Sequence, residues 1–256
     1  MIFLVAEFRS AMADLFRTRR DFWVVAGLVL FGALVSAAEL LAAQLFSIII
    51  IPGEGPARST NDTIWLAVAF LVVFGGLRVL NFGQSLYRVN VFEKAFQGTS
   101  ASRAGESWRW ATAMELTSIL SMSARIVVVS AALVLLSPLF AAANALIALV
   151  VLQMFGMTLR RQLVTQQGFR DQQLSKEPAS SADKVRARIK AGELGALLSS
   201  VGVMILMAVL IALTILGEIP AGAALVSFLA VRMIGQMYSG ISTGLMRFAR
   251  ARVNSD

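Results

Sequence analysis

Six long apolar stretches constrain the fold of this chain more than any other feature. They cover residues 22–51, 63–83, 118–137, 139–158, 195–216 and 221–240. A helix needs about 20 apolar residues to cross the ~30 Å hydrocarbon core of a bilayer. The composition agrees, since 57% of the residues are hydrophobic, above the share typical of soluble domains. We therefore expect an all-α membrane protein with six transmembrane helices.

Residues 1–20, ahead of the first stretch, form an amphipathic pattern. Its apolar residues recur at helical spacing: Val5, Phe8, Met12, Leu15 and Phe16. Its charged residues fall elsewhere on the helical wheel: Glu7, Arg9, Asp14 and Arg17. This pattern predicts a helix that lies in the membrane interface before the first span. It lacks the basic start, apolar core and small-residue cleavage site of a secretory signal.

The distribution of basic residues predicts the orientation in the membrane. Lysine and arginine are concentrated before the first stretch, between the second and third, between the fourth and fifth, and after the sixth. The connection after the first stretch has only Arg58, and the two remaining turns have none. By the positive-inside rule, we expect both termini in the cytoplasm and the protein in the inner (plasma) membrane. The net charge of +8 then needs no nucleic-acid partner.

The two basic connections are compatible with helix along most of their length. Residues 84–117 are interrupted by QGTSASRAGE and residues 159–194 by SKEPASSAD. Each is expected to form a helical arm that leaves the membrane and returns, although solvated charged loops of this kind are also common. The expected organisation is therefore an elbow helix at 1–20, a six-span domain with two arms at 21–253, and a tail at 254–256.

Catalytic motifs are lacking in this sequence. It contains no histidine or cysteine, which removes most transition-metal, thiol and imidazole chemistry. It has no Walker-type phosphate-binding loop and no nucleophile elbow. We expect a protein that is not an enzyme and binds no cofactor itself. A membrane enzyme acting on lipid has the least support.

Four charged residues fall inside the apolar stretches: Glu39, Arg78, Arg125 and Arg232. A charge at membrane depth costs about 2.5–3.5 kcal/mol on insertion scales, so it usually faces the bundle or water. In one interpretation Glu39 pairs with one arginine, and the others snorkel or bind carbonyl groups. In the other, the excess of arginine makes an inner cavity positive and suited to an anionic headgroup or acidic substrate.

Several stretches together resemble the transmembrane domain of a type I (exporter-type) ABC transporter. FRTRRDFWVVAGLVLFGALVSAAELLAAQLF is similar to the elbow helix and first span of that family. LNFGQSLYRVNVFEKAF resembles its second span running into an arm, and SARIVVVSAALVLLSPLFAAANALIALVVL its third and fourth spans. The clearest similarity is in GEIPAGAALVSFLAVRMIGQMYSGISTGLMRFARARV, which resembles the last span and its basic exit.

The resemblance implies the permease subunit of an exporter, which moves an anionic lipid, glycolipid or peptide. The family's ATPase domain does not follow the sixth stretch, so a separate nucleotide-binding subunit would hold ATP and Mg. Two copies, or this chain and a paralogue, would enclose the substrate cavity in the bilayer. By position, the contacts to the ATPase would lie at the arm tips and include Gln97, Arg103, Glu106, Lys176 and Asp183. The arms are shorter than in the family, and this keeps open a structural or assembly subunit without transport activity.

Overall fold

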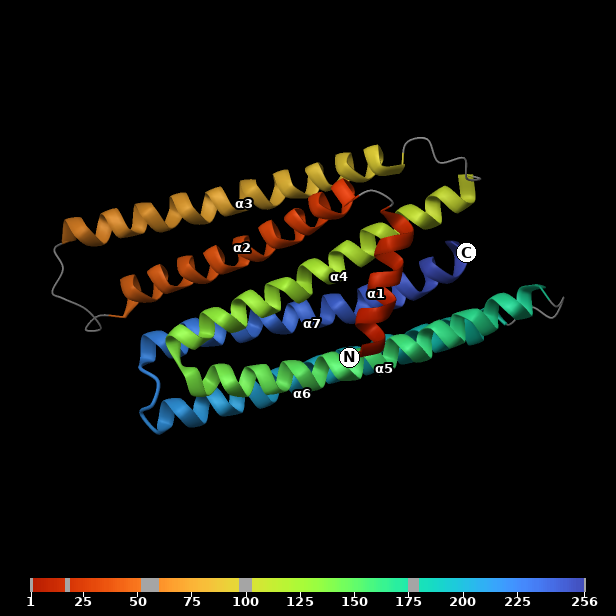
Figure 1. Cartoon of the computed structure of the whole chain (residues 1–256). Helices are drawn as coiled ribbons and strands as arrows, with labels where there is room; N and C mark the ends of the chain where they lie inside the picture. Colours follow the sequence, from red (N-terminus) through yellow and green to blue (C-terminus); the bar gives the residue numbers. More distant parts are fainter. Residues whose placement is uncertain (1, 17–18, 52–59, 97–102, 175–179, 256) are drawn as a thin grey trace.

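The computed structural model describes residues 2–16, 19–51, 60–96, 103–174 and 180–255, and these fold into α-helices without a β-strand. The helices are α1 (Ile2–Leu15), α2 (Arg19–Ile50), α3 (Thr60–Phe96), α4 (Arg103–Leu136), α5 (Pro138–Leu174), α6 (Ser181–Ile215) and α7 (Ala221–Ser255). Helices α2 to α7 run along a common direction, and α1 crosses the bundle (Figure 1).

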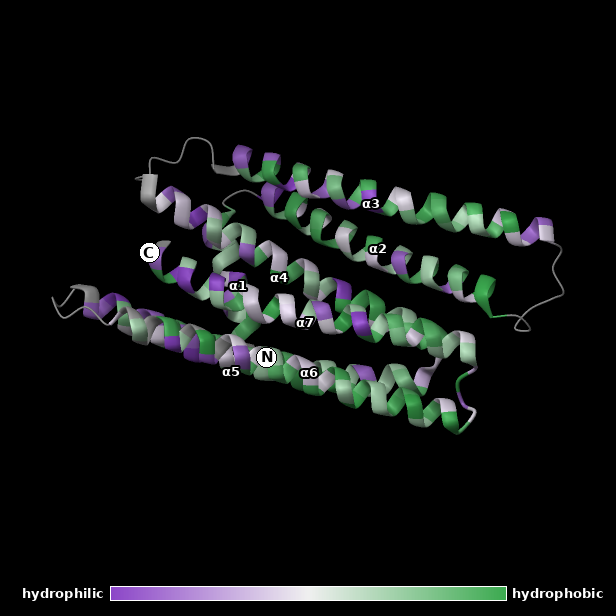
Figure 2. Ribbon diagram, turned by 180° about the vertical axis from the view of Figure 1, so that it is seen from behind, coloured by the Kyte–Doolittle hydropathy of each residue, from purple (hydrophilic) through white to green (hydrophobic). Residues whose placement is uncertain are grey.

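Each of the helices α2 to α7 is long and apolar enough to cross a bilayer. The six stretches expected from hydropathy fall on these six helices, one on each. Hydrophobic residues dominate the middle of the bundle in Figure 2. The expectation of a multi-pass, all-helical membrane protein is thus confirmed.

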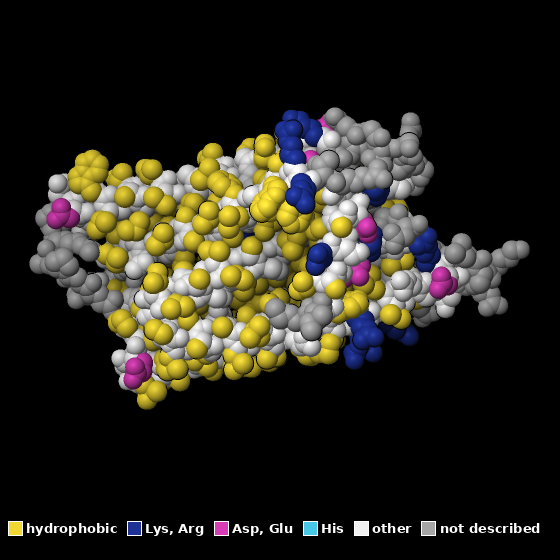
Figure 3. All heavy atoms as spheres, viewed as in Figure 1, with side chains coloured by type: hydrophobic (Ala, Val, Ile, Leu, Met, Phe, Trp, Pro, Cys, Tyr) yellow, Lys and Arg dark blue, Asp and Glu magenta, His cyan; other side chains and the backbone are white. Residues whose placement is uncertain are grey.

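The two ends of the bundle differ. At one end, α4 and α5 are joined by Ser137 alone, whose hydroxyl accepts a hydrogen bond from the Phe140 amide at 3.3 Å. At the same end a short turn links α6 to α7, and Gly217 adopts φ 75° there, which favours glycine. At the other end, which holds the C-terminus, α3 to α6 continue through most of the predicted arms (Figure 1). Lysine and arginine side chains gather toward this end (Figure 3).

Helix α7 lies in the core and packs against α2, α4, α5 and α6. Its side chains Tyr238, Ile234 and Phe248 are fully buried. Helix α3 is placed differently, because it packs mainly against α2 and exposes large apolar side chains along most of its length. In a bilayer these exposed faces contact lipid or another membrane protein.

The amphipathic N-terminal helix packs onto the bundle through its apolar stripe. Of the expected stripe, Phe8, Met12, Leu15 and Phe16 are buried and Val5 is exposed. The Phe8 ring meets Phe248 edge-on, with 5.5 Å between the ring centroids. The guanidinium of Arg252 forms ion pairs with Asp14 at 2.6 Å and Glu7 at 3.7 Å. The elbow is therefore attached to the C-terminal end of α7 by both apolar and ionic contacts.

Candidate functional site

The four charged residues expected at membrane depth do not converge in a single chain. Glu39 on α2 is half-buried and accepts a hydrogen bond from the Asn81 amide at 3.3 Å. Its charge attracts the guanidinium of Arg125 on α4. Arg78 on α3 is exposed, with its guanidinium carbon 5.1 Å from the centre of the Phe74 ring. Arg232 on α7 is exposed as well, so Glu39 and Arg125 are the two members that lie near each other.

A polar pocket of about 270 Å³ lies beside Arg125, between α2, α3 and α4. Its polar lining consists of Asn81, Gln84, Ser85, Arg88, Thr117, Ser118, Ser121 and Arg125, and its apolar lining of Leu28 and Met122. We call this cavity the polar pocket. None of its described lining residues is a carboxylate.

Helical spacing brings the lining residues together. On α3 they follow one another by three, one and three positions, and on α4 they fall within two turns, so each set shares one helix face. Gln84 fixes the position of α3 by donating a hydrogen bond to the Leu28 carbonyl of α2 at 2.8 Å. Gly32 permits the close approach, because a Cβ at that position would lie 2.6 Å from the Gln84 amide nitrogen and 3.3 Å from the Arg125 guanidinium.

Three buried polar atoms of the lining have no hydrogen-bond partner in the described part of the chain. They are Nε of Arg88, Nε of Arg125 and the hydroxyl oxygen of Thr117, a residue that is only 1% exposed. Buried polar atoms in native proteins are usually hydrogen-bonded, so unpaired ones need an explanation. All three atoms belong to residues that line the polar pocket.

The charges around the pocket are unbalanced. The guanidinium groups of Arg88 and Arg125 repel each other across it. The carboxylate of Glu115 attracts Arg88, but it also forms an ion pair with Arg247 of α7 at 3.5 Å. Glu39 is held by Asn81. Three arginines therefore share two glutamates, and the polar pocket has an excess of positive charge.

A second polar feature is a stripe along α7, which we call the α7 polar stripe. Its members are Arg232, Gln236, Ser239 and Thr243, which lie on one helix face and are all exposed. The first three line a groove of about 570 Å³ between α6 and α7, together with Ser199 and Ser200. The described part of this chain leaves that groove uncovered.

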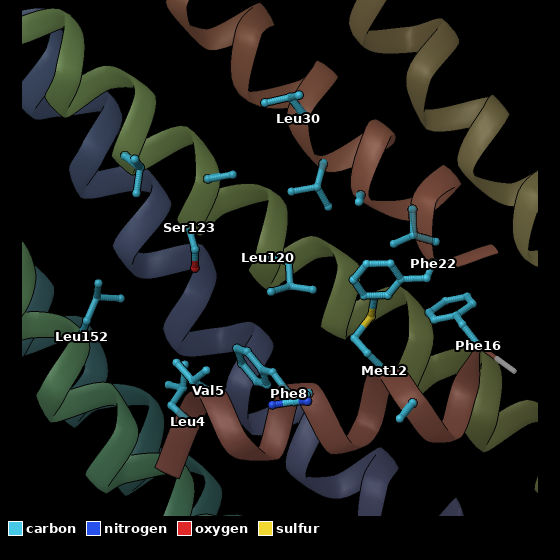
Figure 4. Close-up of a pocket in the computed structure, with 17 residues that line it drawn as sticks. Leu4, Val5, Phe8, Met12, Phe16, Phe22, Leu30, Leu120, Ser123 and Leu152 are labelled. Carbon is cyan, nitrogen blue, oxygen red and sulfur yellow. The ribbon is translucent and has the colours of Figure 1, made fainter. Parts of the chain in front are cut away.

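An apolar pocket of about 780 Å³ lies between α1, α2, α4 and α5 (Figure 4). Phe8 of α1, Phe22 of α2 and Leu120 of α4 are among its lining side chains. Among the described residues, its polar lining side chains are Arg9 and Ser123. This lining suits hydrocarbon and supplies few groups that could orient a polar ligand.

The residues expected to contact an ATPase are only partly described. Gln97 and Lys176 lie outside the described residues. Arg103 and Asp183 lie near the starts of α4 and α6, and their side chains are outside the description as well. Glu106 is exposed in the first turn of α4. Among the described residues, no group of acidic side chains is arranged to hold a metal ion.

Sequence reasoning missed most of the polar pocket. It treated Arg88 only as a basic flanking residue and did not single out Asn81, Gln84, Thr117 or Ser121. The available signal was the helical spacing of polar residues on α3 and α4, around the end of the second apolar stretch and the start of the third.

No protein-family model matches this chain, and no curated protein is significantly similar to it. The class of the protein is given by its fold alone. It is a multi-pass helical membrane protein with six helices that could cross the bilayer. Any more specific function depends on the pockets and charges described above.

Proposed function

We propose that this protein is the permease half of an ABC-type exporter in the inner (plasma) membrane, with both termini in the cytoplasm. The arrangement of the helices supports this proposal. A crossing helix precedes six long apolar helices; short turns join α4 to α5 and α6 to α7 at one end, and α3 to α6 extend further at the basic end. Basic residues favour the cytoplasmic side, so the extended end would face the cytoplasm.

The α7 polar stripe is the observation that carries the proposal. Polar and charged side chains inside a membrane almost always face the bundle interior or a water-filled cavity. Arg232 and Gln236 lie in the apolar span of α7, yet they are exposed on a single chain. If a second membrane-spanning half faced this stripe, the stripe and the polar pocket would both line one cavity between the two halves. The second half would be another copy of this chain or a paralogue.

The driving energy would come from a nucleotide-binding ATPase subunit, which would hold ATP and Mg. This subunit would bind the extended ends of α3 to α6. Its movements would switch the cavity between inward- and outward-facing states. The transported substrate would be an anionic lipid, glycolipid or peptide, because the cavity has an excess of arginine.

Cross-linking tests the pairing of two halves. The chain has no native cysteine, so a cross-link from this chain must come from the single cysteine that is introduced. Gln236→Cys should form a disulfide or bismaleimide cross-link to a second membrane subunit in native membranes. Leu135→Cys is the control, because Leu135 is 89% exposed on α4 and is not part of the α7 polar stripe. Equal cross-linking of both variants, or of neither, would contradict a paired cavity.

Purification of the native complex tests whether an ATPase subunit is present. We expect an ATPase to copurify and its ATP hydrolysis to respond to Arg125→Gln and Arg232→Gln, while assembly is retained. A complex with no ATP hydrolysis would exclude ATP-driven transport.

A second candidate is a structural or assembly subunit of a larger membrane complex. The short extension of α5 favours it, since only about 16 residues, or ~24 Å of helix, follow the expected fourth span. An exporter requires paired transmembrane halves, whereas an assembly subunit does not. A single copy of this fold in the native complex, with equal loss of folded protein in Arg125→Gln and Arg232→Gln, would support the second candidate.

A further inference from the structure

We propose that the polar pocket binds one phosphate-like oxoanion, held between Arg88 of α3 and Arg125 of α4. This inference names the substrate class of the proposed exporter and to that extent rests on the proposed function. Binding itself needs neither ATP nor the ATPase, so it can be measured separately from transport.

The first argument is the set of donors without acceptors. Arg88, Arg125 and Thr117 all line the pocket, and each has a buried donor, Nε or hydroxyl, without a partner in the described part of the chain. An oxoanion accepts hydrogen bonds from all three groups. Arginine is especially suited to this role, because its planar guanidinium donates two parallel hydrogen bonds to phosphate or carboxylate oxygens.

The second argument is electrostatic. The two guanidinium groups repel each other, and the nearest carboxylates are already engaged by Asn81 and Arg247. An anion between the guanidinium groups would turn this repulsion into attraction. A cation is disfavoured for the same reason, since the pocket lining contains no carboxylate.

The third argument is size and shape. The volume of about 270 Å³ is below the ~300–1,000 Å³ typical of sites for drug-sized ligands. Eight of the ten lining residues have a polar side chain, which favours an oxygen-rich group over an apolar one. The pocket therefore fits a compact, oxygen-rich group. Serine and amide side chains around the rim, such as Ser118 and Ser121, supply further hydrogen bonds to oxygen.

A phosphate group could come from a lipid headgroup or from a free phosphate compound. The experiment separates these sources by using two probes, inorganic phosphate and a short-chain phosphatidic acid. The native complex is reconstituted in phosphatidylcholine nanodiscs without nucleotide, and the affinity for each probe is measured by titration calorimetry. Binding of both probes assigns a general phosphate site, and binding of phosphatidic acid alone assigns a lipid headgroup site. Binding of neither probe overturns the inference.

Substitutions locate the site. Arg88→Gln and Arg125→Gln should each weaken probe binding by about 10- to 100-fold, the range expected when one hydrogen bond to a charged group is lost. The matched control is Arg78→Gln, which removes the same charge from an exposed position at membrane depth. Wild-type affinity in the first two variants, or an equal loss in the control, contradicts the assignment.

Thr117→Val covers the case in which an arginine variant does not fold. It keeps the shape and charge of the site and removes only the unpaired hydroxyl, so a loss of a few-fold is expected. Unchanged affinity would show that Thr117 does not contact the anion, and it would overturn the proposed site formed by Arg88, Arg125 and Thr117. Normal phosphate binding in a complex without ATP hydrolysis would reject the exporter but keep the oxoanion site.

Discussion

The polar pocket and the apolar pocket lie on different faces of the same helix. Ser121 of α4 lines the first and Ser123, two residues later and on the other side of the helix, lines the second. The polar pocket contains two arginines in about 270 Å³, whereas the apolar pocket offers about 780 Å³ of hydrocarbon-like lining. The comparison shows that α4 separates two environments in the bilayer, and that the helix periodicity of its sequence is sufficient to do so.

The largest expected effect comes from placing the same negative charge in each pocket. Ala124→Asp puts a carboxylate into the apolar pocket, where insertion scales indicate a cost of about 2.5–3.5 kcal/mol. Ser121→Asp puts it into the polar pocket, where Arg88 and Arg125 compensate for it. We expect Ala124→Asp to lower the yield of folded protein and its melting temperature strongly, and Ser121→Asp to keep both near the wild-type values.

Probe binding completes this test. The carboxylate in Ser121→Asp should occupy the place of the oxoanion and abolish binding of inorganic phosphate and phosphatidic acid. Similar stability losses in the two variants would show that the two pockets do not differ in the way that we describe.

A smaller effect is expected at the contact between α2 and α3. Gly32→Ala would push the Gln84 amide away from the Leu28 carbonyl and so break a 2.8 Å hydrogen bond at the edge of the polar pocket. Gly27→Ala is the control, because a Cβ there has no atom within 4 Å and alanine favours helix. Thermal unfolding should show Gly32→Ala about 1 kcal/mol less stable than the control. If Gly32→Ala is as stable as the control, the close contact between Gly32 of α2 and Gln84 of α3 does not contribute to stability.

The smallest effect concerns α1, which forms one wall of the apolar pocket. Arg252→Gln removes the ion pairs to Glu7 and Asp14 and should cost about 0.5 kcal/mol, since such partly exposed pairs contribute little. Amide hydrogen exchange should increase in α1 and leave α4 unchanged. The exposed residue Arg20 provides the matched control as Arg20→Gln. Faster exchange around Thr117 in Arg252→Gln would show that the two pockets are coupled.

The sequence predicted the helices well because membrane insertion depends on local hydropathy, and each long apolar stretch became one helix. The buried stripe of α1 was also readable from its period, apart from the exposed Val5. The orientation of single charged residues was not readable. Arg125 is half-buried and lines the polar pocket, while Arg78 and Arg232 are exposed, and that difference depends on which helices are neighbours.

Arg88 shows most clearly what could not be predicted from the sequence. In the sequence it is one of several basic residues after an apolar stretch, and the positive-inside rule accounts for it fully. Only the packing of α3 beside α2 and α4 brings it to Thr117 and Arg125. Amphipathic spacing of polar residues at the end of a span is a weak signal, because snorkelling side chains produce the same pattern.

A single residue, Ser137, connects α4 and α5 into a helical hairpin. Each arm of this hairpin is about 50 Å long at 1.5 Å per residue, so a tilt of about 10° around the turn displaces the far tip by about 9 Å. The polar pocket lies partway along α4, where the same tilt moves side chains by a few ångströms. In the proposed exporter, the hairpin would convert a large displacement at the basic end into a small displacement around the polar pocket.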